Sequence, residues 1–466
     1  MPVSKYVYYD FTLSLCPDCL RRVEAKIVFE DGKVFMLKRC PEHGRQKVLI
    51  ATDINYYKNI RNYNKASEYP LRFNTKTHYG CPYDCGLCTD HEQHSCLTIL
   101  EVTDRCNLTC PTCYAESSPT YGRHRTLEEI ERMLDIIVAN EGHPDVVQIS
   151  GGEPTVHPHF WEIMDLAKTR PIRHLMLNTN GIRIANDPGF AERLAGYVPD
   201  FEVYLQFDSF KPEALISLRG RDLTDVRMRA LEKLNQLNLS TTLVVTLQKG
   251  LNDDEMGKII EFALQQPCVR GVTFQPTQAA GRFDNFNPAK DRLTPTGIRQ
   301  GILDQSTVFN PQDLIPVPCN PDALTMAYAL KVDGEIHPLT RYIDPSELLD
   351  NSRNTIVYEQ DEDLHQRVLK IFSTAHSVDA LDDDFKSLLC CLPNIKAPGL
   401  SYDNLFRIII MNFLDAYDFD VRSVKKSCVH IVHPDGRIIP FETMNLFYRD
   451  AAKEARWREL ANTAEI

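Results

Sequence analysis

The stretch "TILEVTDRCNLTCPTCYAE", residues 98–116, joins a predicted β-strand to a loop that holds three cysteines. Its first part, TILEVT (98–103), is rich in β-branched and apolar residues, which favour a buried strand. Cys106, Cys110 and Cys113 follow at the spacing C-x3-C-x2-C. A structural zinc site takes four ligands and disulfides take cysteines in pairs, so three thiols fit neither. Three thiolates can hold three irons of a [4Fe–4S] cluster and leave the fourth iron open to a small molecule.

A strand–loop–helix alternation continues to about residue 275. One helical pattern is TLEEIERMLDIIVAN (126–140), which begins with a capping-box pair, Thr126 and Glu129. Such alternation implies a parallel sheet, and six units are too few for a closed eight-fold barrel. We therefore expect an α/β fold with a partial (βα)6 barrel, whose working residues gather at the carboxyl ends of the strands. The strand candidates are TILEVT (98–103), VVQIS (146–150), HLMLNT (174–179), VYLQF (203–207), TTLVVT (241–246) and GVTFQ (271–275).

Four regions are expected along the chain. Residues 1–60 form a metal-binding knuckle, and residues 61–97 form a segment for an auxiliary iron–sulfur cluster. Residues 98–285 form the partial barrel. Residues 286–466, irregular and with several prolines, form a C-terminal accessory domain.

The composition indicates an ordinary globular protein. The chain has 466 residues, of which 43% are hydrophobic and 25% charged, and its net charge is −12. A negative balance argues against nucleic acid as a partner. No apolar run is long enough to span a bilayer, and the N-terminus has no signal-peptide pattern. We expect a cytoplasmic protein without a membrane span, for which peripheral membrane contact stays open.

The cysteines point to metal rather than to disulfides. The chain has 15 cysteines, and ten of them precede residue 114 in close groups. Disulfides rarely persist in a reducing compartment, so clustered cysteines there favour metal binding. The first group has the spacing C-x2-C…C-x2-H of one tetrahedral zinc or iron ion, with a predicted hairpin around Asp31 and Gly32 between its halves. Its ligands are Cys16, Cys19, Cys40 and His43.

The second group lies in GCPYDCGLCTDHEQHSC (80–96). Four thiolates within one short segment can fully ligate a second [4Fe–4S] cluster, and a four-cysteine zinc site is the alternative. Its first three cysteines repeat the C-x3-C-x2-C spacing and so compete for the role of the later trio. His91 and His94 are expected to be surface residues rather than ligands. The four cysteines are Cys81, Cys85, Cys88 and Cys96.

The remaining cysteines show no metal-binding spacing. Cys268 is expected to be a buried core residue. Whether the C-terminal cysteines hold a third cluster stays open from the sequence. They are Cys319, Cys390, Cys391 and Cys428.

Polar and glycine residues follow the other strand candidates. SGGEP (150–154) ends the second, NTNG (178–181) the third and QFDS (206–209) the fourth. A glycine pair lets backbone approach a ligand closely, and a carboxylate suits a cationic amino group. Arg219 offers a planar guanidinium that fits a carboxylate, although a solvated surface arginine is the alternative.

The C-x3-C-x2-C loop, the aromatic Tyr114 after it and the GGEP turn together resemble the radical S-adenosylmethionine (SAM) superfamily. The resemblance implies that Cys106, Cys110 and Cys113 bind a catalytic [4Fe–4S] cluster whose open iron binds SAM. An electron from the cluster would then release a 5′-deoxyadenosyl radical, and a ferredoxin or flavodoxin would supply it. The residues implied in cofactor binding are Tyr114, Gly151, Gly152, Glu153, Pro154, Asn178, Gln206, Asp208, Arg219 and Gln275.

The order of the motifs, ending in CVHIVHPDGRIIPF (428–441), is similar to that of archaeal tetraether lipid synthase and of the class D radical SAM methyltransferases that act on pterins. That resemblance implies auxiliary [4Fe–4S] clusters and a mononuclear site. This chain has Ser427 and Glu442 where the family pattern has cysteines.

Two classes of function follow. The first is a radical enzyme that activates an sp3 C–H bond for carbon–carbon bond formation on a lipid-like substrate, with C-methylation of a pterin or other small molecule as the alternative. The second is a non-catalytic iron–sulfur electron carrier. The GGEP turn favours the enzyme, because a carrier needs no SAM pocket.

Overall fold

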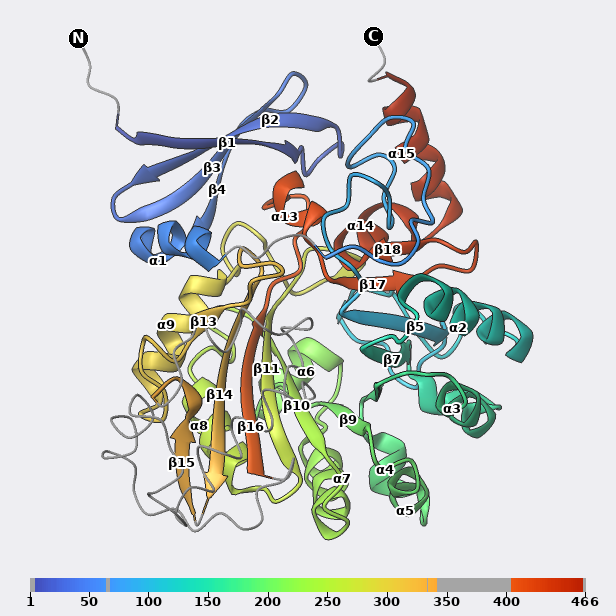
Figure 1. Ribbon diagram of the computed structural model, residues 1–466. Helices are drawn as coiled ribbons and strands as arrows, with labels where there is room; N and C mark the ends of the chain where they lie inside the picture. Colours follow the sequence, from blue (N-terminus) through green and yellow to red (C-terminus); the bar gives the residue numbers. More distant parts are fainter. Residues whose placement is uncertain (1–4, 64–67, 333, 342–403, 464–466) are drawn as a thin grey trace, which may run out of the picture.

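The computed structural model describes residues 5–63, 68–332, 334–341 and 404–463. It contains a four-stranded N-terminal sheet and a large, strongly curved sheet that helices cover on its outer side (Figure 1). Of the C-terminal cysteines, Cys390 and Cys391 lie outside the described residues.

The centre of the large sheet is a row of six parallel strands. They run in the order β5, β7, β8, β9, β10, β11, so strands consecutive in this barrel region are neighbours in the sheet. The row is open, which confirms the predicted partial barrel of six units. The strands are β5 (Leu97–Thr103), β7 (Val146–Gly151), β8 (His174–Thr179), β9 (Phe201–Gln206), β10 (Thr241–Leu247) and β11 (Val269–Pro276).

Strands from the C-terminal region extend both edges of this row. β16 (Leu405–Met411) pairs in parallel with β11, and β14 (Leu324–Val332) pairs antiparallel with β16. At the opposite edge, β17 (Val429–Val432) pairs in parallel with β5, and β18 (Ile438–Pro440) follows it. The boundary expected at residue 285 therefore does not divide the sheet, and strands after it extend the open sheet at both ends. Two short strands, β13 (Ile315–Pro316) and β15 (Glu335–Pro338), flank β14.

Helices pack against the outer face of the sheet through one continuous apolar core. α2 begins with the predicted capping box, in which Thr126 Oγ1 accepts from the Glu129 backbone N–H and Glu129 accepts from that of Thr126. Cys268 lies in this core, as expected. The helices of the barrel region are α2 (Leu127–Glu141), α3 (Phe160–Lys168), α4 (Ile182–Asn186), α5 (Phe190–Ala195), α6 (Pro212–Arg219), α7 (Thr224–Gln236), α8 (Met256–Gln265) and α9 (Pro295–Gln305).

The N-terminal sheet is a meander whose central hairpin turns at Asp31 and Gly32, as the sequence predicts. Lys38 anchors it to the rest of the molecule: its buried ammonium donates to the carbonyls of Leu15, Ala416 and Tyr417 at 2.7–2.8 Å. The elements are β1 (Val7–Leu15), β2 (Arg22–Glu30), β3 (Lys33–Cys40), β4 (Gly44–Ala51) and α1 (Ile54–Asn59).

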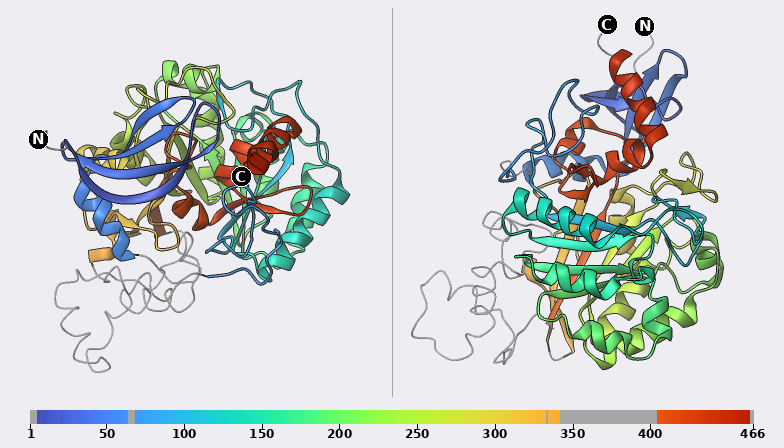
Figure 2. Two further views of the ribbon diagram at one scale, coloured as in Figure 1. Left: turned by 90° about the horizontal axis from the view of Figure 1, so that it is seen from above. Right: turned by 90° about the vertical axis from the view of Figure 1, so that its right-hand side faces the viewer.

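The C-terminal helices lie on the same side of the molecule as the N-terminal sheet (Figures 1 and 2). They are α13 (Val421–Lys425), α14 (Phe441–Thr443) with a π-helical turn over Met444–Tyr448, and α15 (Ala451–Thr463). Among the described residues, every helix is too short or too polar to cross a membrane.

Candidate active site and metal centres

The carboxyl ends of the parallel strands enclose a cavity, at the edge where open α/β sheets bind their ligands. Each strand of the central row contributes to its wall directly or through the loop that follows. The lining residues after these strands include Cys106, Cys110 and Cys113 (β5), Gly151, Gly152 and Glu153 (β7), Asn178, Thr179 and Asn180 (β8), Gln206 (β9), Thr246 (β10), and Gln275 to Gln278 (β11).

The cysteine loop between β5 and α2 presents all three of its thiols to this cavity. A two-stranded ladder holds the loop in place, in which β6 (Thr112–Cys113) pairs with β12 (Arg282–Phe283) from the segment after β11. Burial raises the pKa of the Cys106 and Cys110 thiols. Buried thiolates need a cation close by, and iron bound to the sulfurs would supply that charge. The three thiols therefore fit an iron–sulfur cluster.

The glycine pair packs the end of β7 against the start of the cysteine loop. A Cβ on Gly151, whose φ is +125°, would lie 2.2 Å from the Thr103 carbonyl oxygen, and one on Gly152 would lie 2.2 Å from that of Arg105. The backbone N–H of Gly152 donates to the Thr103 carbonyl at 2.8 Å. The close approach that demands glycine here is between two segments of the chain itself, and it sets the cysteine loop beside the cavity.

Glu153 is buried, and its carboxylate accepts hydrogen bonds from the chain itself. Oε1 accepts from the Thr155 hydroxyl at 2.6 Å and from the Thr179 hydroxyl at 2.8 Å, and Oε2 accepts from the Asn180 backbone N–H at 2.8 Å. Burial nevertheless raises the pKa of Glu153. The side chain thus ties the ends of β7 and β8 together at the cavity wall.

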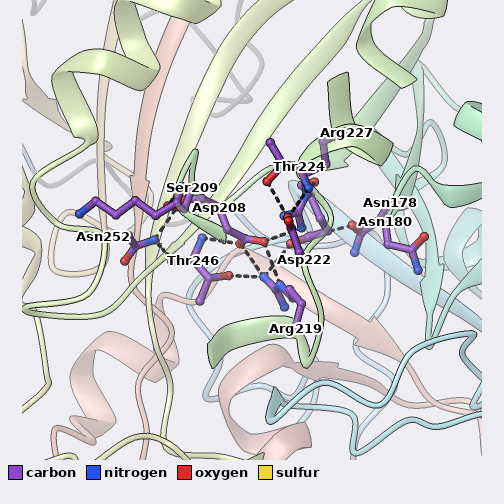
Figure 3. Close-up of polar contacts among 12 residues, drawn as sticks. Asn178, Asn180, Asp208, Ser209, Arg219, Asp222, Thr224, Arg227, Thr246 and Asn252 are labelled. Atoms are coloured by element: carbon purple, nitrogen blue, oxygen red, sulfur yellow. Dashed lines mark hydrogen bonds and ion pairs between the residues drawn. The ribbon is translucent and has the colours of Figure 1, made fainter. Parts of the chain in front are cut away.

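Asp208 organises an ion-pair network behind the cavity (Figure 3). Arg219 donates to both of its oxygens, at 2.8 and 2.6 Å, and Arg227 donates to one at 2.7 Å. Burial raises the pKa of Asp208, but the two guanidinium groups outweigh that effect and lower it to about 2. Arg219 also donates to Gln206 and Thr246, and it lines the cavity. It is therefore a cation held in place by its partners and largely buried, rather than a solvated surface arginine.

The four predicted ligands of the N-terminal knuckle come together. Their ligand atoms all lie within 4.8 Å of one another, and they are Cys16, Cys19, Cys40 and His43. His43 Nδ1 lies 3.6 Å from Cys16 Sγ and 3.5 Å from Cys40 Sγ. Burial raises the pKa of Cys40, but hydrogen bonds from the His43 backbone and ring lower it to about 6. Three sulfurs and one nitrogen at these separations fit a single tetrahedral ion.

The second cysteine group differs from the sequence expectation. Cys81, Cys85 and Cys88 line one small cavity together. Cys96 does not join them but lies with Cys319 and Cys428, where the three sulfurs are within 4.8 Å of one another. The sequence spacing misled here because the chain turns away after Cys88 and enters the sheet directly after Cys96.

His91 and His94 are buried, which corrects the expectation of surface residues. His91 Nε2 lies 2.8 Å from the Ser427 carbonyl oxygen and 3.0 Å from His430 Nε2. His94 Nδ1 lies 3.1 Å from a Glu141 carboxylate oxygen. Both rings therefore help to join the 80–96 segment to the barrel.

Comparison with known proteins agrees with this geometry. The Radical SAM superfamily model matches residues 100–263, and the HMPTM N-terminal zinc ribbon domain matches residues 8–52. The 7,8-dihydro-6-hydroxymethylpterin dimethyltransferase of Methanocaldococcus jannaschii is 32% identical over 95% of this chain and 94% of its own. This chain belongs to the radical SAM superfamily.

Similarity extends more weakly to other members of the superfamily. The GTP 3′,8-cyclase of Syntrophomonas wolfei is 29% identical over 48% of this chain and 67% of its own. The solved structure of SuiB from Streptococcus suis bound to S-adenosylmethionine covers 45% of this chain and 46% of its own, with 15% identity and a TM-score of 0.38.

Membership of the radical SAM superfamily makes the protein an enzyme that uses a [4Fe–4S] cluster and SAM. The further cysteine groups and the zinc ribbon fit an auxiliary cluster and one mononuclear ion. Most of the residues predicted to bind the cofactor line the cavity: Tyr114, Gly151, Gly152, Glu153, Asn178, Gln206, Arg219 and Gln275. Pro154 begins a short 3-10 helix, and Asp208 lies behind Arg219; neither belongs to the lining.

Several lining residues were not predicted. Arg227 comes from the inner face of α7, Phe413 follows β16, and Phe441 begins α14. The apolar pattern of a strand or helix does not distinguish such residues from core. A proline–phenylalanine step at the end of CVHIVHPDGRIIPF was the available signal for Phe441.

Proposed function

We propose that the protein is a radical SAM C-methyltransferase whose substrate is a pterin-like ring. The observation that carries the proposal is the 32% identity to the pterin dimethyltransferase of M. jannaschii over 95% of this chain. The cavity lining offers groups that a polar ring can pair with, because carboxamides from the ends of β8, β9 and β11 face it. The lipid-like substrate expected from the sequence has no support in the comparisons.

The wall formed by the ends of β11 and β16 and by α14 suits a flat heteroaromatic ring. Phe413 and Phe441 lie against each other with ring centroids 3.9 Å apart, and Tyr114 lies 4.8 Å from Phe441. Aromatic side chains offer faces for stacking, and a few placed polar groups fix orientation. Gln275 and Gln278 bring carboxamides to the same wall, and these can pair with the alternating donors and acceptors of a pterin edge.

We assign the catalytic cluster to Cys106, Cys110 and Cys113, because these thiols adjoin the turn after β7 and the polar strand ends. The cluster and SAM together supply, when bound, a 5′-deoxyadenosyl radical that takes hydrogen from the substrate. Arg219 provides a fixed positive charge at the wall, which attracts the carboxylate of SAM. We assign an auxiliary cluster to Cys81, Cys85 and Cys88, which share a separate cavity.

A 7,8-dihydropterin has a saturated carbon at ring position 7, so the predicted sp3 C–H bond is present in this substrate class. The test is anaerobic incubation of the holoenzyme with SAM, a reductant and 7,8-dihydro-6-hydroxymethylpterin deuterated at that carbon. We expect deuterium in 5′-deoxyadenosine. A parallel incubation uses a deuterated archaeal-type lipid.

Transfer of deuterium from the lipid and not from the pterin would overturn the substrate class while leaving the radical chemistry in place. Absence of 5′-deoxyadenosine under every condition would overturn the enzyme assignment itself. In cell extract that supplies the methyl source, the pterin product should gain the mass of one or two methyl groups.

A further inference from the structure

Three cysteines from distant parts of the chain meet outside the cavity and outside the N-terminal metal site. Cys96 directly precedes β5, Cys319 lies in the turn between β13 and β14, and Cys428 directly precedes β17. Their sulfurs all lie within 4.8 Å of one another, and those of Cys319 and Cys428 are 3.3 Å apart. All three side chains are buried, and none is in a disulfide. None of the three cysteines lines the cavity, so the shape of the cavity does not explain why they lie together.

The separations fit one ion better than a cluster. With metal–sulfur bonds of about 2.3 Å, a tetrahedral ion holds its sulfurs roughly 3.8 Å apart. The N-terminal site of the same molecule has this separation, with Cys19 Sγ and Cys40 Sγ 3.8 Å apart. A [4Fe–4S] cluster binds each thiolate to a different iron and so holds them farther apart. Accordingly, among the described residues, neither C-x3-C-x2-C loop forms a group as tight as this one.

Polar side chains lie beside the sulfur of Cys96, as they do around metal-bound thiolates. Gln93 Nε2 donates to Cys96 Sγ at 3.7 Å, and His94 Nε2 lies 3.5 Å from the same sulfur. The His94 ring is oriented in turn by Glu141, 3.1 Å from its Nδ1. Partners of this kind, which hold ligands in place and offset their charge, are typical of built metal sites.

Oxygen groups lie on the side of Cys428. The hydroxyl of Ser427, the residue before Cys428, donates to the buried carboxyl of Glu442 at 3.0 Å. Zinc accepts a carboxylate oxygen beside sulfur, so Glu442 is the nearby side chain of suitable chemistry, although its oxygens lie outside the group of three sulfurs. Soft thiolates select zinc-class ions among the divalent metals.

We propose that Cys96, Cys319 and Cys428 bind a single divalent ion of the zinc class. The ion ties β17 and the turn before β14 to the first strand of the barrel. The backbone already supports this junction, because the N–H of Leu97 donates to the carbonyl of Cys428 at 3.1 Å. The site is therefore a structural clamp that fastens the C-terminal segment onto the barrel.

The experiment counts zinc, iron and acid-labile sulfide per chain in full-length protein purified anaerobically. Cys16→Ala first empties the N-terminal site, so that one zinc remains. Cys428→Ala in that background should reduce the remaining zinc from about one to near zero without lowering iron or sulfide. The matched control is Cys268→Ala in the same background, because Cys268 is also buried but lies in the barrel core; it should retain the zinc.

Because Cys428 is itself a core side chain, a second measurement avoids mutating it. X-ray absorption at the zinc edge of the Cys16→Ala protein should show three sulfur neighbours at about 2.3 Å. Zinc that persists in the Cys428→Ala protein, or a zinc edge without sulfur neighbours, would overturn the site. Loss of iron together with sulfide would overturn the single ion in favour of a cluster. Loss of one iron without sulfide would overturn the zinc assignment in favour of a single iron ion.

Discussion

Asp208 is the residue on which the polar wall of the cavity depends most. It is completely buried and faces two guanidinium groups, those of Arg219 and Arg227. Asp208→Asn should lower the free energy of unfolding by about 3 kcal/mol, because it leaves two buried cations without their carboxylate. Chemical denaturation measures this, with Asp222→Asn, an exposed position in the same region (Figure 3), as the control.

The same carboxylate makes a pH prediction. The pKa of Asp208 is lowered to about 2 from its ordinary value of 3.8. The contribution of its ion pairs to the free energy of unfolding is therefore fully present above about pH 4. That contribution should disappear as the pH falls toward 2, because protonation breaks the pairs with Arg219 and Arg227. The stability difference between wild type and Asp208→Asn should therefore shrink over this interval. A constant difference from pH 6 to pH 2 would contradict the ion-pair account.

Phe413 tests the ring-binding wall of the cavity. Phe413→Ala should raise the KM for the pterin about tenfold, because it removes a stacking face worth about 1 kcal/mol beyond its buried area. Phe413→Tyr keeps the ring and should restore most of the wild-type KM. Steady-state kinetics with varied pterin at saturating SAM measures both variants. An unchanged KM in Phe413→Ala would remove this residue from the substrate wall.

For single residues, the sequence shows which side chains lie near the cavity better than it shows which side chains pair with each other. Asn178, Gln206 and Gln275 could be placed in the cavity because each is the last or the penultimate residue of a parallel strand. The sequence could not predict that Arg219 pairs with Asp208, because that pairing depends on how α6 and the end of β9 face each other. Asp208, expected to bind the cofactor, accepts from Arg219 in the structure.

Among the elements, the turn after β7 carries the tightest constraint. Gly152→Ala should reduce the rate of 5′-deoxyadenosine formation at least tenfold, because its new Cβ would lie 2.2 Å from the Arg105 carbonyl and displace the cysteine loop. Gly297→Ala in α9 is the control, since its Cβ meets only the Thr294 hydroxyl, at 3.2 Å. Reductive cleavage of SAM measures both. If Gly152→Ala cleaves SAM at the wild-type rate, the turn can accommodate a Cβ that the structure leaves no room for.

The strands of the central row could be located from sequence because each is a short β-rich run before a polar turn. The strands that extend this row on either side could not be located in the same way. β16 and β17 begin more than 120 residues from the strands that they pair with, β11 and β5, and no local pattern encodes such pairing. For the same reason, spacing along the chain grouped Cys96 with Cys88, whereas the sheet edge brings it to Cys428.

At the scale of the whole molecule, Lys38 joins the N-terminal sheet to the barrel. Lys38→Met should weaken that contact, because it leaves the buried carbonyls of Leu15, Ala416 and Tyr417 without their donor, at a cost of about 1–3 kcal/mol for each carbonyl left unsatisfied. Hydrogen exchange should then speed up in β1 and β3 well before it does in the central row. Lys26→Met, on the exposed face of the same sheet, is the control. Equal exchange in both variants would show that the anchor lies elsewhere.

The central claim is that the loop after β5, and not the similar loop at residues 81–88, holds the cluster that cleaves SAM. The direct measurement is 5′-deoxyadenosine formed by reconstituted protein with dithionite and SAM. Replacing Cys106, Cys110 and Cys113 together with alanine should abolish the product, whereas replacing Cys81, Cys85 and Cys88 should leave reductive cleavage detectable. Product from the first variant and none from the second would contradict the account and move the catalytic cluster to the earlier loop.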